Sequence, residues 1–381
     1  MRPSYIDPRV SGVIRYSCAL LFILFSSCYL LFLQGNLLAE AQFVFSRGLT
    51  TYSIFVGAFT ITAGLQIIQW VVVRIIHFNW QYYSFSYLPS LLLLAMLTNI
   101  TRSDLYDFSL GHWWWLLPLI LVVFFGVVYL FKDRFATSNS TRYLLWRNYL
   151  ILFILILLCG AIPRTHEVDH YELTAENCIM EQDYEEATKI AEKSLHTSRR
   201  LTELRMFALS QQGLLAERLF DYPQNYRGDG LLKISDNDSI YRYSPLRICF
   251  RLGALPKTNQ NPTTLKYLWA VNSVDSLRTP VTQDYLLCYL LLQKKLKSFE
   301  KKLQEFYPVE TDSILPRAYK EAVVYINNVY GENLKYVIDE DTQNRFEQYK
   351  NRKTEISNPV ARRNLIRRDF GNTFWWYYEN K

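Results

Sequence analysis

Long runs without charged residues dominate the first part of this chain. Four runs lack Asp, Glu, Lys and Arg: Tyr16–Ala39, Gly48–Val73, Ile75–Thr101 and Phe108–Phe131. A shorter fifth run, Asn148–Pro163, reaches span length if Arg147 extends its charge to the interface. A bilayer core requires roughly 20 consecutive apolar residues in a helix. The runs therefore predict five transmembrane helices, near residues 13–33, 51–73, 82–100, 113–131 and 145–162.

Charge divides the chain into two domains. Residues 1–163 contain ten Lys and Arg and five Asp and Glu, whereas residues 164–381 contain 32 and 30. The first part therefore has the composition of a transmembrane domain and the second that of a water-exposed globular domain. Because the second part is almost neutral, it lacks the basic surface that DNA or RNA binding requires. The expected partners are membrane lipid and proteins, not nucleic acid.

The loops between the predicted spans differ in positive charge. Eight basic residues fall on one side of the membrane: Arg2, Arg9, Arg15, Arg74, Lys132, Arg134, Arg142 and Arg147. Only Arg47, Arg102 and Arg164 fall on the other side. Lys and Arg accumulate in short cytoplasmic loops. The asymmetry predicts a cytoplasmic N-terminus in a bacterial inner membrane, and five crossings then place residues 164–381 in the periplasm.

The second domain has the pattern of amphipathic helices and few strand signals. Four helix starts pair a capping side chain with a proline, which the first helical turn tolerates. These pairs are Ser244-Pro245, Asn261-Pro262, Thr279-Pro280 and Asn358-Pro359. The stretch from Asp221 to Ser239 is rich in turn-forming residues and predicts an irregular connection. We therefore expect an all-α protein.

One stretch of the second domain resembles a tetratricopeptide repeat. In "EQDYEEATKIAEKSL" (Glu181–Leu195), a short turn precedes an aromatic residue, acidic residues and a small Ala, as in the centre of that repeat. Tyr184, Ala187, Ala191, Ser194 and Leu195 have the spacing of the second repeat helix, although Gln182 replaces the usual turn glycine. The stretches from Tyr285 to Pro308 and from Leu315 to Gly331 predict further hairpins. Such hairpins stack to share one core. The alternative is an irregular helical bundle without a binding groove.

The sequence "HEVDH" is the one stretch that suggests metal chemistry. His166 and His170, four residues apart on a helix, can bind zinc while Glu167 activates water. Asp169, however, occupies a position that metalloproteases with this motif generally keep uncharged. A five-residue motif also recurs by chance, so the simpler interpretation is a solvated start of the first helix after the membrane.

Three acidic residues of the predicted outer loops suggest a second enzymatic alternative. Glu40, Asp104 and Asp107 lie near the membrane surface, where polytopic lipid-linked glycan transferases place catalytic carboxylates. Isolated acids without a binding motif are more often ordinary loop charges. The sequence therefore assigns no catalytic, cofactor-binding or metal-binding residue, and predicts no cofactor.

Five consecutive aromatic residues, Phe374–Tyr378, lie three residues before the end of the sequence. They follow a predicted helix that Asn358 caps and Gly371 ends. Three roles are open: covering the last apolar face of the helical domain, resting on the membrane surface, or binding a partner. In the second role, Arg362, Arg363, Arg367 and Arg368 face lipid head groups. We favour the first role because Trp and Tyr bury a large area and keep a polar atom available.

Four segments together resemble a family of polytopic membrane proteins of Bacteroidota that has no known function. They are Leu37–Thr60, Tyr87–Leu97, the hairpin around Asp183–Leu195, and "FGNTFWWYY" near the end. The resemblance implies residence in the inner membrane and a tetratricopeptide-like domain after the spans. The leading hypothesis is a membrane protein that presents a helical domain as a scaffold for protein partners. The alternative is a membrane enzyme, either the transferase or the zinc peptidase described above.

Overall fold

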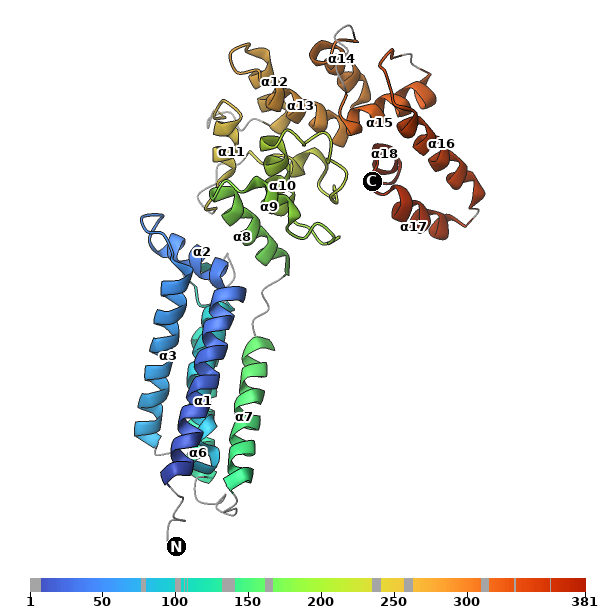
Figure 1. The fold of residues 1–381 in the computed structure, drawn as a ribbon. Helices are drawn as coiled ribbons and strands as arrows, with labels where there is room; N and C mark the ends of the chain where they lie inside the picture. The colour runs from blue at the N-terminus through green and yellow to red at the C-terminus, as the bar shows by residue number, and fades with distance from the viewer. Residues whose placement is uncertain are drawn as a thin grey trace. The chain divides into compact units, whose positions relative to one another are not determined.

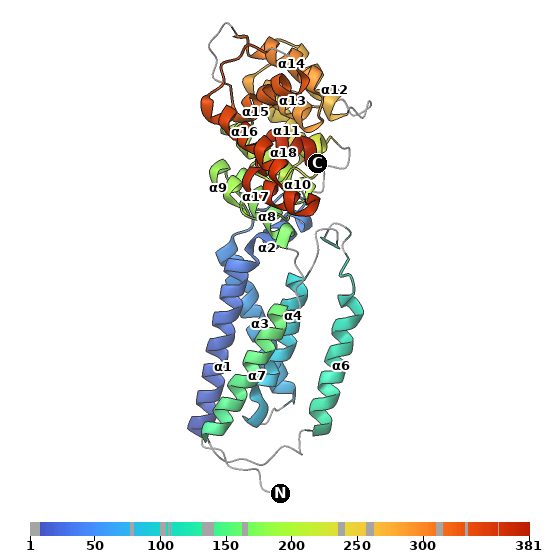
Figure 2. The same cartoon turned by 90° about the vertical axis from the view of Figure 1, so that its right-hand side faces the viewer.

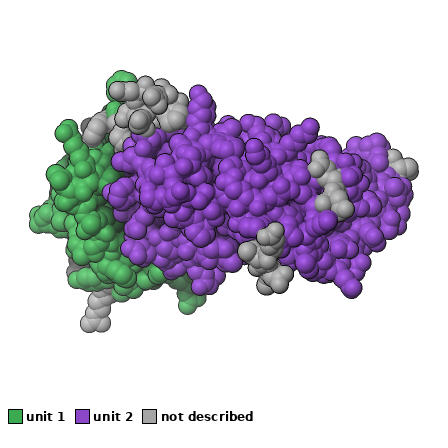
Figure 3. Space-filling model, turned by 90° about the horizontal axis from the view of Figure 1, so that it is seen from above, with its two compact units in different colours: residues 1–170 green, residues 171–381 purple. Residues whose placement is uncertain are grey.

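We describe the protein from a computed structural model (Figure 1). The structure describes residues 8–76, 80–99, 104–105, 107, 109–131, 141–161, 167–234, 241–256, 263–309, 315–331, 334–356 and 358–381. Across these residues every regular element is a helix and no strand occurs, which confirms the all-α prediction. The chain divides into two compact units, residues 1–170 and 171–381 (Figure 3).

Unit 1 consists of long apolar helices with two irregular helical segments. Its elements are α1 (Pro8–Cys28), the π-helical η1 (Tyr29–Leu33), α2 (Gly35–Phe45), α3 (Ile54–Ile76), the 3₁₀-helical η2 (Trp80–Tyr87), α4 (Leu88–Thr98), α6 (Trp113–Phe131) and α7 (Thr141–Ala161). Three helical stretches are long and apolar enough to cross a membrane: Val10–Leu33, Ile54–Ile76 and Arg142–Ala161. These correspond to the first, second and fifth predicted spans. Tyr82–Thr98 and Trp113–Val127 are apolar but shorter.

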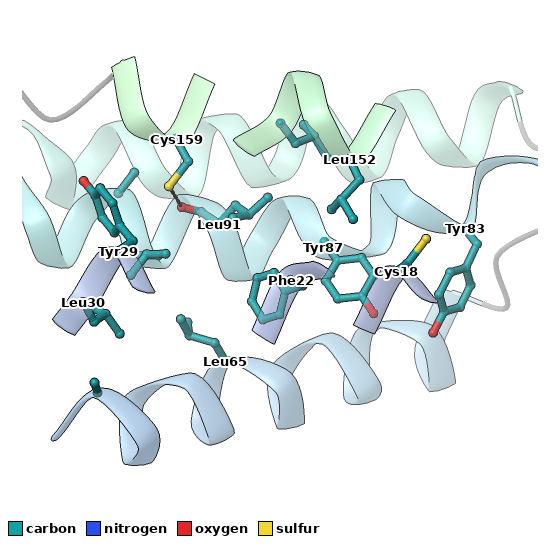
Figure 4. Close-up of a cluster of buried hydrophobic side chains, with 14 of the residues drawn as sticks. Cys18, Phe22, Tyr29, Leu30, Leu65, Tyr83, Tyr87, Leu91, Leu152 and Cys159 are labelled. Carbon is teal, nitrogen blue, oxygen red and sulfur yellow. Dashed lines mark hydrogen bonds between the residues drawn. The ribbon is translucent and has the colours of Figure 1, made fainter. Parts of the chain in front are cut away.

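The helices of unit 1 enclose one apolar core. Helix α1 packs on α3 and α7, and α4 packs on α3 and α7 (Figure 2). The ring centroids of Phe22 and Tyr87 lie 4.9 Å apart in this core. The Cys159 thiol donates a hydrogen bond to the Leu91 carbonyl over 3.4 Å, which links α7 to α4 (Figure 4).

Buried polar side chains connect the helices of unit 1 at several levels. The Asn148 side-chain oxygen on α7 accepts hydrogen bonds from the backbone N–H and the hydroxyl of Ser84 on η2, at 3.0 and 3.1 Å. The Gln69 amide on α3 donates to the Ser86 hydroxyl over 2.8 Å. Between apolar helices, polar side chains of this kind contribute to association through hydrogen bonds from one helix to another.

Unit 2 is a succession of shorter helices. They are α8 (Glu167–Met180), which begins just before the unit, α9 (Tyr184–Lys189), α10 (Arg199–Gln211), η3 (Arg227–Gly230), α11 (Pro245–Arg251), α12 (Thr264–Ser273), α13 (Pro280–Leu292), α14 (Leu296–Phe306), α15 (Arg317–Tyr325), η7 (Ile326–Tyr330), α16 (Glu340–Glu355), α17 (Pro359–Phe370) and α18 (Phe374–Asn380). Helices that follow one another in the chain pack as hairpins, among them α12 with α13 and α13 with α14.

Three predicted helix starts are confirmed. Ser244, Thr279 and Asn358 each cap the helix that begins at the following proline. Thr279 and Thr282 bond each other's backbone N–H groups and so form a capping box. The fourth pair, Asn261-Pro262, lies outside the described residues. Helix α17 ends immediately before Gly371, as predicted.

The hairpin predicted around Glu181–Leu195 is only partly helical. Helix α9 ends at Lys189, and Ala191 has a left-handed backbone with φ of 52°. The Arg205 guanidinium on α10 donates hydrogen bonds to the carbonyls of Ile190 and Ala191, at 2.7 and 3.0 Å. In a continuing helix, the same two carbonyls would accept hydrogen bonds from backbone N–H groups of the next turn. Ala191, Ser194 and Leu195 therefore lie in an irregular segment, not in the second helix that their spacing predicts.

The core of unit 2 makes a prediction about phenylalanine truncation. The Phe299 side chain on α14 is 0 % exposed and its ring lies 5.7 Å from that of Tyr319. We expect Phe299→Ala to destabilise unit 2 by about 3–5 kcal/mol, because a cavity replaces the ring. The measurement is urea unfolding of the full chain in detergent, followed by hydrogen exchange of unit 2. The matched control is Phe250→Ala on α11, where the side chain is 68 % exposed and the expected change is below about 0.5 kcal/mol. Equal effects of the two variants would contradict this assignment of the core.

Candidate functional site

The aromatic helix α18 is a buried element of unit 2. Thr373 caps its first turn by accepting a hydrogen bond from the Trp376 N–H. The rings of Phe374, Trp375, Trp376 and Tyr377 are all buried. Phe220 packs on the rings of residues 374 and 377, with centroid distances of 5.9 and 5.3 Å. The unit's own side chains therefore cover these four rings.

A charged cluster centred on Arg317 fixes the start of α18. The Arg317 guanidinium donates to a Glu321 carboxylate oxygen over 3.0 Å and to the Asn372 carbonyl over 2.7 Å. The other oxygen of Glu321 accepts from the Phe374 N–H over 2.7 Å. Since the Glu321 side chain is almost fully buried, its charge depends on these donors. The same guanidinium also pairs with Asp221 at 3.1 Å.

A cleft of about 340 Å³ lies beside α18, and we call it the α18 cleft. Its walls come from four segments that are distant in the sequence. They are residues 192–195 after α9, residues 220–224 in the irregular stretch after α10, Arg345 on α16, and residues from 367 to 381 around the α17–α18 turn. The last group is Arg367, Arg368, Asp369, Gly371, Asn372, Trp376, Tyr377 and Lys381. A volume of this size is at the lower end of ligand-binding pockets.

The acidic side chains of the α18 cleft are already paired with arginines. Glu192 accepts from Arg218 at 2.7 Å, and Asp221 accepts from Arg218 and Arg317 at 3.3 and 3.1 Å. Asp369 pairs with its neighbour Arg368 at 3.0 Å. The negative charge of the lining is therefore neutralised within the protein.

Two arginines of the cleft retain their positive charge. Arg345 donates to the neutral side-chain oxygen of Asn372 over 2.9 Å, and Arg367 is exposed. Neither forms a salt bridge with any residue in the described part of the chain. Burial, together with the charges of Arg367 and Arg363, lowers the pKa of Lys381. The positive charges are thus close enough to disfavour one another, and the cleft favours an anion.

Two buried polar atoms of the cleft residues have no partner among the described residues. They are the Trp376 indole Nε1, a donor, and the Gln224 side-chain Oε1, an acceptor. Trp376 is 5 % exposed and Gln224 is 3 % exposed. Buried polar groups in proteins are nearly always hydrogen-bonded, so an unsatisfied pair at one cleft is unusual.

The histidine motif is not assembled into a metal site within the described residues. His166 lies outside them, Glu167 is exposed, and His170 is half-buried on α8. Burial lowers the pKa of His170, and the neighbouring Asp169 opposes this effect. No cluster of three or more His, Cys, Asp or Glu side chains that could hold a metal ion occurs in the part that the structure describes.

The three acids of the transferase hypothesis differ in their surroundings. Glu40 on α2 is 0 % exposed, Asp104 is half-buried and Asp107 is exposed. They do not form a cluster that could hold a metal ion among the described residues.

The sequence analysis missed the residues that form the α18 cleft. It considered Arg367 and Arg368 only in the alternative in which they face lipid head groups, and both line this cleft. The available signal was the basic run "ARRNLIRRDF" directly before an aromatic run. Its meaning depended on Arg345 and residues 192–224, which no local pattern connects with it.

These observations define an all-α protein that combines apolar helices of membrane-spanning length with a separate helical unit containing a basic cleft. The chain belongs to DUF6057, a family of unknown function, which matches residues 12–264 and 272–381. This match confirms the predicted relation to a family without an assigned activity. Comparisons with curated proteins and with solved structures find no match.

The Arg317 cluster makes a prediction that depends on pH. Burial raises the pKa of Glu321, and Arg317 lowers it in opposition. Because the pKa of Glu321 is raised in the folded protein, its contribution to stability is complete below the pKa of an unfolded Glu, about 4.3, and is lost as pH rises. Removing Arg317 raises the pKa of Glu321 further and so increases the stability that is lost at neutral pH. We expect Arg317→Ala to destabilise unit 2 by about 3 kcal/mol at pH 7.5 and by less at pH 4.

The measurement is the free energy of unfolding of both proteins at the two pH values. In the control background Glu321→Gln, position 321 carries no charge, so the cost of Arg317→Ala should be smaller and less dependent on pH. A cost that is the same at both pH values and in both backgrounds would show that Glu321 does not depend on Arg317.

Proposed function

We propose that this protein is an integral membrane protein whose helical unit 2 acts as a scaffold that binds a protein partner. The observation that carries this proposal is the combination of three helices of spanning length in unit 1 with a basic, aromatic cleft in unit 2. The α18 cleft is formed by four segments of unit 2 and carries basic side chains, which supports a role in binding.

We further propose that unit 1 crosses the membrane five times. The 3₁₀-helical η2 leads directly into α4, but a kink at Tyr82, where φ is −132° and ψ is 29°, interrupts the start of η2. At about 2.0 Å per residue for a 3₁₀-helix and about 1.5 Å for an α-helix, residues 83–98 beyond the kink extend about 26 Å. The nineteen residues of α6 extend about 28 Å. Both lengths are close to the hydrocarbon core of a bilayer, which is about 30 Å thick.

The proposed topology places the N-terminus in the cytoplasm of a bacterium and unit 2 in the periplasm. It rests on the excess of Lys and Arg in the loops on one side of the five helices. Within unit 2, we propose an arrangement similar to tetratricopeptide repeats. This rests on the succession of hairpins formed by α9 with α10, α12 with α13, and α13 with α14. A stack of hairpins provides a rigid surface for a partner.

The topology can be tested by introducing a cysteine into unit 2 and measuring its reaction with a maleimide in intact cells. We choose Val360→Cys, because Val360 is 71 % exposed on α17. A reagent that does not cross the inner membrane should label this cysteine before lysis. The control is a cysteine at Ser138 in the loop between the fourth and fifth spans, which should react only after lysis. The reverse pattern would contradict the periplasmic location.

The scaffold role can be tested by site-specific photo-crosslinking in living cells. A photoreactive amino acid at Leu195, which is 62 % exposed and lines the α18 cleft, should yield one covalent adduct with a defined protein. The matched control position is Val360, which is similarly exposed but does not line the cleft. Absence of any protein adduct from Leu195 and from other exposed positions of unit 2 would refute the scaffold role.

A further inference from the structure

The chemistry of the α18 cleft restricts the kind of partner that unit 2 can bind. We propose that the cleft binds an acidic peptide segment of the partner protein, whose Asp or Glu carboxylates contact Arg345 and Arg367. The proposal rests on the scaffold function and adds the chemical class of the partner and the residues that select it. Two independent observations support it.

The first observation is the distribution of charge in the cleft. Every acidic side chain of the lining is paired with an arginine of unit 2. Arg345 and Arg367 form no ion pair within the described part of the chain, although the charge of Arg345 also acts on Glu321. Their guanidinium groups come from different helices, α16 and α17. Guanidinium groups bind carboxylates through two parallel hydrogen bonds, which gives both affinity and direction. Two separate arginines therefore suit an extended ligand with more than one carboxylate.

The second observation is the aromatic part of the lining. Phe220, Tyr222, Trp376 and Tyr377 contribute to the same cleft as the arginines. These four side chains are only 2 to 7 % exposed, so they give the cleft a narrow apolar floor beside its charged rim. A simple anion such as phosphate would use the arginines and leave this apolar surface without a function. A peptide that alternates acidic and apolar side chains would use both.

Nucleic acid is a poor alternative occupant. Residues 164–381 contain almost equal numbers of basic and acidic residues, and the positive charge of the cleft is local. Binding to a phosphate backbone depends on many Lys and Arg contacts over a long surface. A lipid phosphate or a free phosphate needs only the arginines, so these two ligands are included in the test.

The test uses the full-length protein in nanodiscs and fluorescent eight-residue peptides, with binding measured by anisotropy. One peptide alternates Glu and Leu, and its matched control alternates Gln and Leu. We expect the Glu peptide to bind at least about tenfold more tightly than the Gln peptide, and we expect its affinity to fall as salt concentration rises. Equal affinity for the two peptides in the wild-type protein would overturn the proposal without any need for a variant.

Variants then locate the binding site. Arg345→Gln and Arg367→Gln should each weaken binding of the Glu peptide by about tenfold. The matched control is Arg362→Gln, since Arg362 lies on α17 but does not line the cleft, and its effect should stay below about twofold. The double variant R345E/R367E should instead bind a peptide that alternates Lys and Leu. A purely structural role for the arginines would not produce this reversal.

Two further ligands distinguish the proposal from its alternatives. Pyrophosphate is titrated against the protein, and nanodiscs with and without phosphatidylglycerol are compared. Binding of pyrophosphate or anionic lipid that depends on Arg345 and Arg367, without binding of any peptide, would overturn the proposal in favour of a phosphate ligand. Failure of the peptide together with a protein adduct at Leu195 would leave the scaffold function standing and reject only the acidic peptide. Loss of both results would reject the two proposals together.

Discussion

The organisation of unit 2 depends on the buried contact between Arg317 and Glu321. Their ion pair of 3.0 Å lies under the start of α18, and Glu321 uses its second oxygen to bind the Phe374 N–H. A buried carboxylate is costly unless donors surround it, so the pair specifies one position for the last helix. Because the same arginine binds the Asn372 carbonyl and Asp221, it also connects two walls of the α18 cleft. The stability of the unit and the shape of its cleft therefore share one origin.

Unit 1 also depends on hydrogen bonds between buried polar side chains. In an apolar environment every backbone and side-chain polar group must find a partner inside the protein. Asn148 and Gln69 connect α7 and α3 to the η2 segment, where a 3₁₀-helix replaces the α-helix. Pro89 lies in the first turn of α4, where a helix tolerates the missing N–H. The polar links thus hold an irregular helical stretch that the apolar sequence alone would not fix.

The sequence predicts local features of this fold far better than long-range ones. Ser244, Thr279 and Asn358 cap helices because each acts on its own next few residues. Helix α9 ends at Lys189, and Arg205 on the next helix binds the carbonyls at residues 190 and 191. No periodicity contains that information. The α18 cleft also depends on contacts that no local pattern contains. Segments near residues 192, 221, 345 and 367 meet there, and each alone has the pattern of an ordinary charged surface.

The aromatic helix α18 contributes both to the packing of unit 2 and to the lining of the α18 cleft. Phe374 and Trp375 are completely buried and hold α18 in the unit, while Trp376 and Tyr377 on the same helix reach the cleft. A helix anchored on one side can present its other side without conformational freedom, which reduces the entropy that a ligand must remove on binding. A flexible aromatic tail would bind many apolar surfaces. Arg317 and Arg345 instead both bind Asn372, just before α18, and so fix the helix next to defined positive charges.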